Sequence, residues 1–363
     1  MSKKILFIAA MPPPVHGQST VNLSVYQKLI DNKCNVNLFD VSPSVDGSRF
    51  LYHFSRIKKY FIAWIYIVFF AGRTDSVYTV YESGFGYIYN ILTLLLFRLK
   101  RGKFFLHHHT AAHTKFFSRR FYLLCKIFGN YITHIVLSEN MMKDVRVKYN
   151  QKSFIVSTNA YSIDEMLLNK NETKNRASEE IRIGLMSNLS KEKGLYDSID
   201  VVNDLLKNNY NCRLILAGPI KKMEDKLFLK SIVENSNGKI EYIGPVFGED
   251  KKKYFENIDV FLFPSSYRYE AQPLVVLEAM ASGCPVFAIN AGYTGELLPD
   301  KNWYFGCVDD FNHGVAKMII NYINNPKDFD NDSSMSRRHF VYLKNKSIQE
   351  KNDMINLLVM AGS

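Results

Sequence analysis

The chain has 363 residues, 47% of them hydrophobic, so it carries enough apolar side chains for two ordinary domain cores and is not a disordered protein. Its 46 lysines and arginines outnumber its 35 acidic residues, and the net charge of +11 favours anionic partners such as nucleotides, phosphorylated lipids or a membrane face. The sequence lacks the spacings of zinc-binding and RNA-binding modules, which argues against nucleic acid as a partner.

The cysteines and the apolar segments predict where the protein works. Its five cysteines are scattered, which is typical of reduced thiols in the cytoplasm. The most apolar segments, 61–72 and 87–97, are shorter than the roughly 20 residues that a membrane-spanning helix needs. The first follows the basic stretch RIKKY, so it is either a buried helix or a face that lies on anionic lipid. We expect a cytoplasmic protein that can contact the inner face of the cytoplasmic membrane peripherally.

Short apolar runs alternate with helical patterns through the first half of the chain. A helix is expected over 18–32, and strands are expected at 4–10, 35–41, 76–81, 103–109, 134–139 and 153–158. Such alternation predicts an α/β fold with a parallel sheet covered by helices on both faces.

The second half repeats this rhythm after a polar segment, 168–181, that reads as a linker. Strands are expected at 181–187, 213–218, 240–246, 259–265 and 285–290, with helices between them. The predicted domains are an N-terminal Rossmann-like domain, 1–168, and a C-terminal one, 169–335. An amphipathic helix, about 336–363, is expected to pack back on the first domain. Two facing α/β units predict a deep cleft between them.

Two glutamates flank the start of a predicted helix in the second half. Pro273 opens this helix and Gly283 ends it, so Glu270 precedes the helix and Glu278 lies in its second turn. The free amides of a helix start, here from Leu274 onward, suit a diphosphate. The carboxylates would then hold hydroxyls on either side of it, as in a nucleotide sugar. The alternative is that Glu278 caps a surface helix and Glu270 is solvated.

The surrounding residues resemble the C-terminal signature of retaining GT-B glycosyltransferases of family four. The matching pieces are Glu-x7-Glu, AMASGCPVFA and GYTGEL, preceded by LMSNLSKEKGL, RLILAGP and EYIGPV; PPPVHGQS and FFLHHHTAAH match the first half more loosely. The resemblance implies the GT-B fold. It also implies that Glu278 binds the donor ribose, that Glu270 lies by the donor sugar, and that Gln272 and the amides of Leu274 and Val275 contact the donor.

The resemblance also assigns cations to the donor phosphates. Lys193 is the candidate that stabilises the leaving group without a metal, because charge builds on the phosphate as the glycosidic bond breaks. The family usually carries arginine five residues earlier, where this chain has Asn188, which cannot neutralise charge. Lys191 is a substitute for that arginine, or an ordinary exposed lysine. This departure puts donor type and activity in question.

In the first half, the resemblance assigns Gly17 to the donor and a histidine at a strand end to the donor sugar. His109 aligns best, and His107 and His108 are its rivals. A metal site formed by these residues with His113 is not expected, because alternate strand residues face opposite sides and no carboxylate cluster accompanies them.

Four further residues are weaker candidates for contact with the acceptor. They are His16, Glu82, Ser138 and Asn159, which lie at or after the ends of expected strands. For such polar residues, helix caps and turns are an equally good interpretation.

The expected function is a metal-independent retaining transferase that needs no cofactor besides its nucleotide-sugar co-substrate. It would move a hexose from a UDP-linked donor to a glycan or a lipid-diphosphate-linked glycan in bacterial surface polysaccharide synthesis, such as that of O-antigen or capsule. Two alternatives stay open: a non-hydrolysing nucleotide-sugar epimerase, and a non-catalytic GT-B partner in a glycan-assembly complex. A dinucleotide oxidoreductase is disfavoured because the first strand leads to PPPVHGQS and not to a G-x-G-x-x-G loop.

Overall fold

A computed structural model describes residues 4–43, 49–72, 75–168 and 180–361, with the side chains of 49–53 and 360–361 left out. The chain forms two compact units: unit 1 is Met1–Ser162 with Asn345–Ser363, and unit 2 is Ile163–Lys344. The domain limits expected at 168 and 335 stay predictions, because most of the expected linker (169–179) lies outside the described residues.

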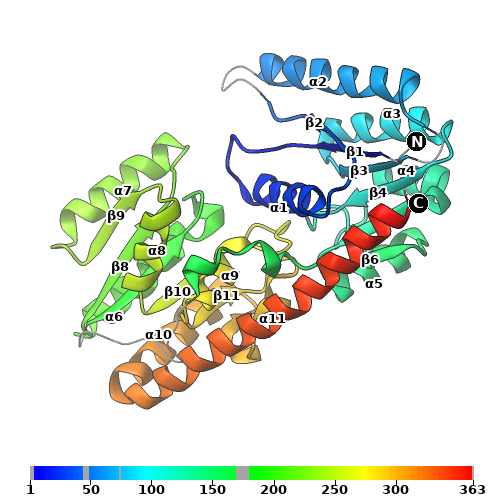
Figure 1. The fold of residues 1–363 in the computed structure, drawn as a ribbon. Coiled ribbons are helices and arrows are strands. Elements are labelled where there is room, and N and C mark those ends of the chain that lie inside the picture. Colours follow the sequence, from blue (N-terminus) through cyan, green and yellow to red (C-terminus); the bar gives the residue numbers. More distant parts are fainter. Residues whose placement is uncertain (1–3, 44–48, 73–74, 169–179, 362–363) are drawn as a thin grey trace. The chain divides into compact units, whose positions relative to one another are not determined.

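Unit 1 is built on a six-stranded parallel sheet (Figure 1). In spatial order its strands are β2 (Val36–Asp40), β1 (Ile5–Ala9), β3 (Ser76–Val80), β4 (Lys103–His107), β5 (Ile132–Val136) and β6 (Phe154–Val156). Every residue of β1 and β3 is buried, as expected for central strands that are covered on both faces.

Helices cover both faces of this sheet. They are α1 (Gly17–Asp31), α2 (Arg49–Phe69), α3 (Tyr87–Arg98), α4 (Arg119–Phe128) and α5 (Glu139–Tyr149). Because parallel crossovers are right-handed, the strand order places α1 on one face and α2 to α5 on the other. In keeping with this, α2 contacts α3, α3 contacts α4, and α4 contacts α5.

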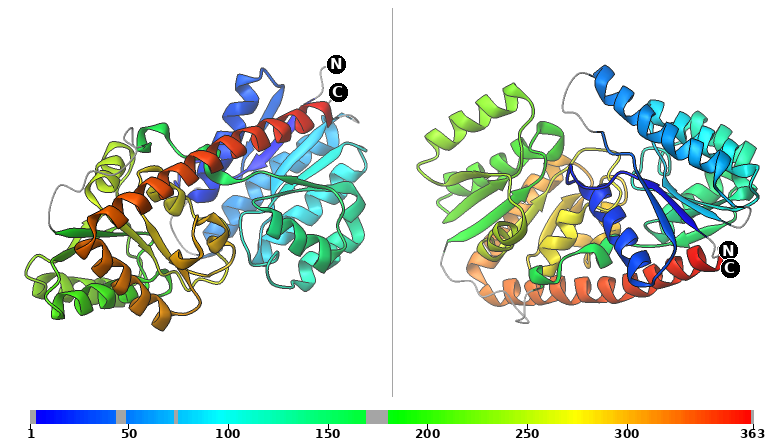
Figure 2. Two further views of the ribbon diagram at one scale, coloured as in Figure 1. Left: turned by 90° about the horizontal axis from the view of Figure 1, so that it is seen from below. Right: turned by 45° about the horizontal axis from the view of Figure 1, so that its top comes forward.

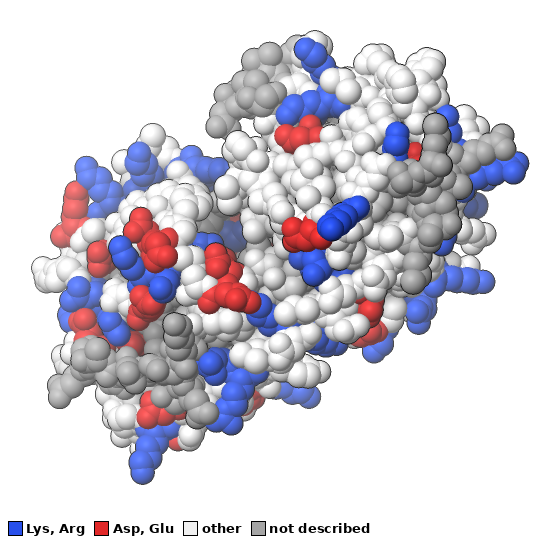
Figure 3. All heavy atoms as spheres, viewed as in Figure 1, with Lys and Arg blue, Asp and Glu red and all other residues white. Residues whose placement is uncertain are grey.

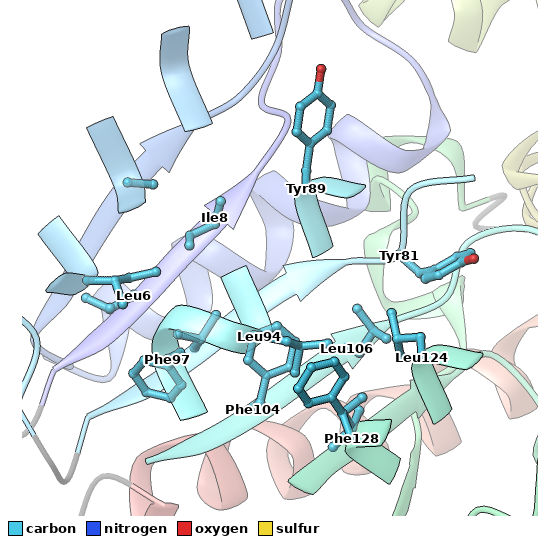
Figure 4. Close-up of a cluster of buried hydrophobic side chains, with 14 of the residues drawn as sticks. Leu6, Ile8, Tyr81, Tyr89, Leu94, Phe97, Phe104, Leu106, Leu124 and Phe128 are labelled. Atoms are coloured by element: carbon cyan, nitrogen blue, oxygen red, sulfur yellow. The ribbon is translucent and has the colours of Figure 1, made fainter. Parts of the chain in front are cut away.

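The main core of unit 1 lies between the sheet and α2 to α5. Figure 4 shows part of it, where Leu6 and Phe104 of the sheet meet Leu94 and Phe97 of α3 and Leu124 of α4. All five side chains are fully buried. The inward faces of α3 and α4 therefore pack against apolar side chains of the sheet.

Unit 2 repeats the architecture with a second six-stranded parallel sheet. In spatial order its strands are β12 (Tyr304–Phe305), β11 (Val286–Ile289), β10 (Val260–Phe263), β7 (Ile181–Met186), β8 (Cys212–Ala217) and β9 (Ile240–Gly244). Its helices are α6 (Leu195–Lys207), α7 (Met223–Asn235), α8 (Gly248–Asn257), α9 (Leu274–Ala281) and α10 (Val308–Asn324). The predicted α/β class with two Rossmann-like units is confirmed.

The last helix, α11 (Pro326–Ala361), begins in unit 2 and ends in unit 1. In unit 1, Glu350 accepts hydrogen bonds from the amide and the hydroxyl of Thr158, at 2.9 and 2.8 Å. Lys351 donates to Ser24 of α1 at 2.9 Å, and Figure 2 shows the C-terminal turns of α11 beside α1. The final turns of α11 are therefore part of unit 1.

Among the helices that the structure describes, none combines the length and the apolar character that crossing a membrane requires.

The contact between α11 and unit 1 gives a first prediction. Glu350→Ala leaves the largely buried Thr158 amide without its acceptor, and we expect the free energy of unfolding to fall by about 1–3 kcal/mol. Gln349→Ala is the matched control, because Gln349 bonds Asp353 on the exposed side of the same helix; its effect should stay within about 0.5 kcal/mol. Urea unfolding measures both, and equal losses would contradict this role of Glu350.

Candidate active site

Two loops of unit 2 meet at the carboxyl ends of neighbouring strands, β7 and β10. The amide of Ser266 donates to the carbonyl of Glu192 at 3.0 Å, which joins the loop after β10 to the loop after β7. Gly194, with φ of +82°, allows this approach, because a Cβ there would lie 2.3 Å from Pro264 Cγ and 2.7 Å from its carbonyl oxygen. The pairing of the strands thus fixes which side chains the two loops bring together.

The side chains brought together are those of Lys193 and Glu270. The Lys193 ammonium forms an ion pair with Glu270 Oε1, which also accepts a 2.9 Å hydrogen bond from Ser265 Oγ. Lys193 Nζ also lies 4.4 Å from the ring centre of Tyr267, within cation–π range. Glu270 is only 8% exposed, so the cation and the hydroxyl stabilise a carboxylate that is largely removed from water.

The GYTGEL segment packs against the backbone of Glu270. The amide of Tyr293 donates to the Glu270 carbonyl at 3.2 Å. Gly292 has φ of +59°, and a Cβ there would lie 1.7 Å from the same carbonyl oxygen. Glycine is therefore required at this position, and the segment holds the Glu270 loop in place.

The helix after Glu270 is α9, which starts one residue later than the sequence indicated. Pro273 is the N-cap with extended ψ of 120°, not the first helical residue. The first backbone bond of the helix runs from the Val276 amide to the Pro273 carbonyl at 3.2 Å. The amides of Leu274 and Val275 precede that bond, so they point out of the helix start, where an anion would bind.

Glu278 lies on the second turn of α9 and is 8% exposed. Its Oε1 accepts a 2.8 Å hydrogen bond from Lys251 Nζ of α8. Its buried Oε2 has no hydrogen-bond partner among the residues that the structure describes. A buried carboxylate oxygen with spare acceptor capacity is suited to a ligand hydroxyl. Lys251 was missed by the sequence analysis, since it lies 27 residues from Glu278 in a charged helix without a motif.

The other donor candidates of unit 2 lie in the same two loops. Gln272 is buried between Glu270 and α9, whereas Asn188 and Lys191 are exposed in the loop that follows β7. Asn188 therefore stands on the surface of the loop that also carries Lys193.

The weaker candidates of unit 1 have structural partners. His16 caps α1, with its Nδ1 accepting from the Ser19 amide at 3.2 Å, and Gly17 is the first residue of that helix. Glu82 forms a two-pronged ion pair with Arg56, at 2.8 and 3.3 Å.

Ser138 caps α5 by accepting from the Met141 amide at 3.1 Å, and Asn159 is buried in a short 3-10 helix. The roles of these unit 1 residues toward an acceptor stay predictions.

The three consecutive histidines at the end of β4 have different environments. His107 Nδ1 lies 2.6 Å from the Tyr78 hydroxyl, inside the core. The ring of His109 lies 4.0 Å from that of His107, centre to centre, at a tilt of 43°, on the same side of the sheet, and keeps part of its surface exposed. Burial, followed by the nearby His16, lowers the pKa of His109 to about 3. His109 is therefore neutral near pH 7, so its ring can donate one hydrogen bond and accept another but carries no charge.

His108 points to the other side and belongs to a buried chain of hydrogen bonds. Gln151 donates its amide to the Tyr149 carbonyl, so its oxygen accepts from His134 Nε2 at 3.1 Å. His134 Nδ1 then accepts from His108 Nε2 at 3.0 Å, and His108 Nδ1 accepts from His113 Nε2 at 2.7 Å. This sequence of contacts places the proton of each neutral ring on Nε2.

The C-terminal half of the chain is similar in sequence to known proteins. Residues 169–334 match the model of the family described as glycosyl transferases group 1. Alpha-monoglucosyldiacylglycerol synthase of Streptococcus pneumoniae is 28% identical over 137 residues, which are 37% of this chain and 30% of that relative. Other curated relatives are likewise matched over 24% to 36% of their length.

Solved structures align over the whole chain. Sucrose-phosphate synthase of Thermosynechococcus elongatus has a TM-score of 0.73 at 15% identity, covering 99% of this chain and 100% of that one. HepE of Anabaena, solved in complex with UDP, has a TM-score of 0.71 at 16% identity, covering 98% and 99%. The predicted GT-B fold, two Rossmann-like units with parallel sheets, is thereby confirmed.

The buried histidines predict a pH dependence of stability. Burial lowers the pKa of His113 to about 3 and that of His134 to about 4, and the pKa of His108 is also well below its usual value. In the unfolded chain each takes up a proton near pH 6.5. Below that pH the unfolded state binds more protons, so the free energy of unfolding should fall by about 1.4 kcal/mol per pH unit for each such histidine.

The measurement is urea unfolding at about pH 7.5 and about pH 5.5, a window above the usual carboxylate pKa values. Trp303→Phe leaves Trp64 of α2 as the single tryptophan, so that fluorescence reports unit 1. His113→Gln should flatten the pH slope, whereas His313→Gln, at an exposed position of α10, should not. Equal stability at both pH values would show that these histidines are not held neutral.

Proposed function

Because residues 169–334 match the family model of glycosyl transferases group 1, we propose that the protein transfers a sugar from a nucleotide diphosphate donor to an acceptor hydroxyl. The observation that carries this proposal is the buried pair of carboxylates on either side of the α9 start. Glu270 is held by Lys193 and Ser265, and Glu278 keeps one buried oxygen available.

The donor fits this arrangement from the diphosphate outward. The amides of Leu274 and Val275 and the positive end of α9 bind the phosphates. Glu278 lies about 6 Å further along the helix, at about 1.5 Å per residue, and accepts from the ribose hydroxyls. Glu270, on the loop before the helix, accepts from hydroxyls of the sugar, and Gln272 lies between them.

Lys193 supports the chemical step. The acceptor oxygen forms its bond to the anomeric carbon as the bond to the phosphate oxygen breaks. The electron pair of the broken bond goes to the phosphate, which also takes up the acceptor proton. A lysine ammonium near this phosphate stabilises the developing charge, and helix amides add to it, so no metal is required. Attack from the face that the phosphate leaves retains the anomeric configuration.

The finer features of the proposal are a UDP-linked hexose as donor and a glycan or lipid-diphosphate-linked glycan as acceptor. HepE, a structural neighbour, was solved with UDP, and the name of the pneumococcal relative describes a glucosylated lipid product. Both support these choices. We place the reaction in bacterial surface polysaccharide synthesis at the inner face of the cytoplasmic membrane. His109 is assigned to the donor sugar by resemblance, and this role stays a prediction.

Asn188 favours a second candidate, a non-catalytic partner that binds the donor in a glycan-assembly complex. Asparagine there cannot supply the positive charge that the family's arginine carries at this position. Donor binding without turnover over a broad panel of acceptors would favour this candidate over the transferase.

Loss of the Glu278 carboxylate should weaken UDP binding. Hydrogen bonds to a charged group contribute about 1.5–3 kcal/mol, so we expect the Kd of Glu278→Ala to rise at least about tenfold. Isothermal titration calorimetry with UDP measures this. Glu256→Ala, at an exposed position of α8, is the control and should bind UDP like the unchanged protein. Unchanged UDP affinity in a folded Glu278→Ala protein would remove Glu278 from the site.

Loss of the Lys193 ammonium should slow the chemical step. For Lys193→Ala we expect kcat at saturating donor to fall by roughly 10²-fold, the usual cost of one charge-stabilising donor. Lys221→Ala, at an exposed position, serves as control. The assay contains EDTA, because the proposal needs no divalent metal. Activity that depends on an added metal, or a kcat unaffected by Lys193→Ala, would refute this mechanism.

A further inference from the structure

Helix α2 of unit 1 is apolar on both of its faces. Its inward face, with Tyr60, Ala63 and Ile67, is fully buried against the sheet and α3. Its outward face carries a second apolar stripe at helical spacing, formed by Phe54, Ile57, Phe61, Ile62, Ile65, Val68 and Phe69. Phe61 is 56% exposed and Phe69 is 73% exposed. The core is complete without this stripe, so the fold alone does not account for it.

The neighbouring helices extend the stripe into a surface. Exposed apolar residues of α3 and the turns beside it are Phe85, Ile88, Leu92, Leu95 and Leu99, and those of α4 and its approach are Phe117, Tyr122, Leu123 and Ile127. Leu99 is 80% exposed. Because α2, α3 and α4 lie in contact on one face of the sheet, these residues form what we call the α2–α4 surface. In Figure 3 most of the surface over α2 consists of atoms of uncharged residues.

The segment of the chain that forms this surface is rich in basic residues. From residue 47 to residue 138 lysine or arginine occurs at 49, 56, 58, 59, 73, 98, 100, 101, 103, 115, 119, 120 and 126, and the acidic residues are Asp75 and Glu82. Both acids are engaged inside the fold: Asp75 accepts from the amides of Lys4 and Gly72, and Glu82 is paired with Arg56. The segment therefore presents an excess of basic side chains to its surroundings.

A cavity at the edge of the α2–α4 surface is also lined by positively charged side chains. It has a volume of about 480 Å³ and is lined by Arg98, Tyr122, Lys126 and Ile127 among others, with no acidic side chain in its lining. Tyr122 and Ile127 also belong to the exposed apolar set. The cavity thus places cations beside apolar side chains, a combination that matches a lipid headgroup next to its acyl chains.

We infer that the α2–α4 surface docks on an anionic lipid bilayer. Contiguous exposed apolar surface of this kind marks an interaction site. Apolar helix faces flanked by lysine and arginine bind at the boundary between headgroups and acyl chains of anionic membranes. A symmetric contact between two copies of this chain would bring the same basic margins together, which is unfavourable. A nucleic acid would use the cations but would leave the apolar stripe in water.

The test is vesicle co-sedimentation of the full chain, without donor or acceptor, so that its outcome is independent of the proposed transfer activity. Vesicles of phosphatidylcholine with phosphatidylglycerol should bind the protein, and vesicles of phosphatidylcholine alone should bind it at least about tenfold more weakly. Added salt should weaken binding to the anionic vesicles, because the basic margin contributes electrostatically.

Two pairs of variants assign the binding to this surface. Ile62→Ser with Phe69→Ser should reduce binding to anionic vesicles about tenfold or more, since both side chains would insert between lipids. The matched control is Met223→Ser with Leu227→Ser, two residues of similar exposure on α7 of unit 2. Lys58→Glu with Arg119→Glu should also weaken binding, whereas Lys230→Glu on α7 should not. Circular dichroism and thermal melting check that each variant is folded.

The inference is overturned if the unchanged protein does not bind anionic vesicles, or if the α2 and α7 double variants bind equally well. It is also overturned if the unchanged protein does not bind vesicles but forms a dimer that the α2 variant disrupts. The α2–α4 surface would then bind a second copy of the chain. Binding that is lost in the α2 variant and kept in the α7 variant supports it.

Discussion

The ion pair between Lys193 and Glu270 joins the two loops on which the proposed donor site depends. Each loop starts at the end of a neighbouring parallel strand, so the sheet determines their separation, and Gly194 and Gly292 permit the close backbone contacts that the pairing requires. Removal of Lys193 would leave the buried Glu270 carboxylate without its counterion, which is costly. The carboxylate and the start of α9 therefore have fixed positions before a ligand binds, which lowers the entropic cost of holding a donor.

Sequence patterns predicted the features of this site that lie close together along the chain. The α/β class followed from alternating short apolar runs and helical patterns, and the start of α9 was placed to within one residue by Pro273. Lys251, the partner of Glu278, was not predictable, because contact between α8 and α9 arises only when the sheet is assembled. Ser265 was closer to being found, since it directly follows an apolar strand run and precedes Glu270 by five residues.

Unit 1 shows where residue types alone were ambiguous. The resemblance favoured His109 among three adjacent histidines, and the pleat of β4 and its end at His107 separate the three. Both ring nitrogens of His108 are engaged in a buried chain of hydrogen bonds. His107 and His109 lie together on the opposite side of the sheet. For α2, the sequence left open a buried helix or a lipid-facing one. The structure combines the two features that motivated those alternatives, a buried inner face and an exposed apolar outer face.

The most direct test of the account is a crystal structure of the protein with UDP bound. The account predicts that the diphosphate oxygens lie within hydrogen-bonding distance of the Leu274 and Val275 amides, and that a ribose hydroxyl donates to Glu278 Oε2. A nucleotide bound away from the start of α9, or a Glu278 side chain that contacts Lys251 and no part of the UDP, would contradict it.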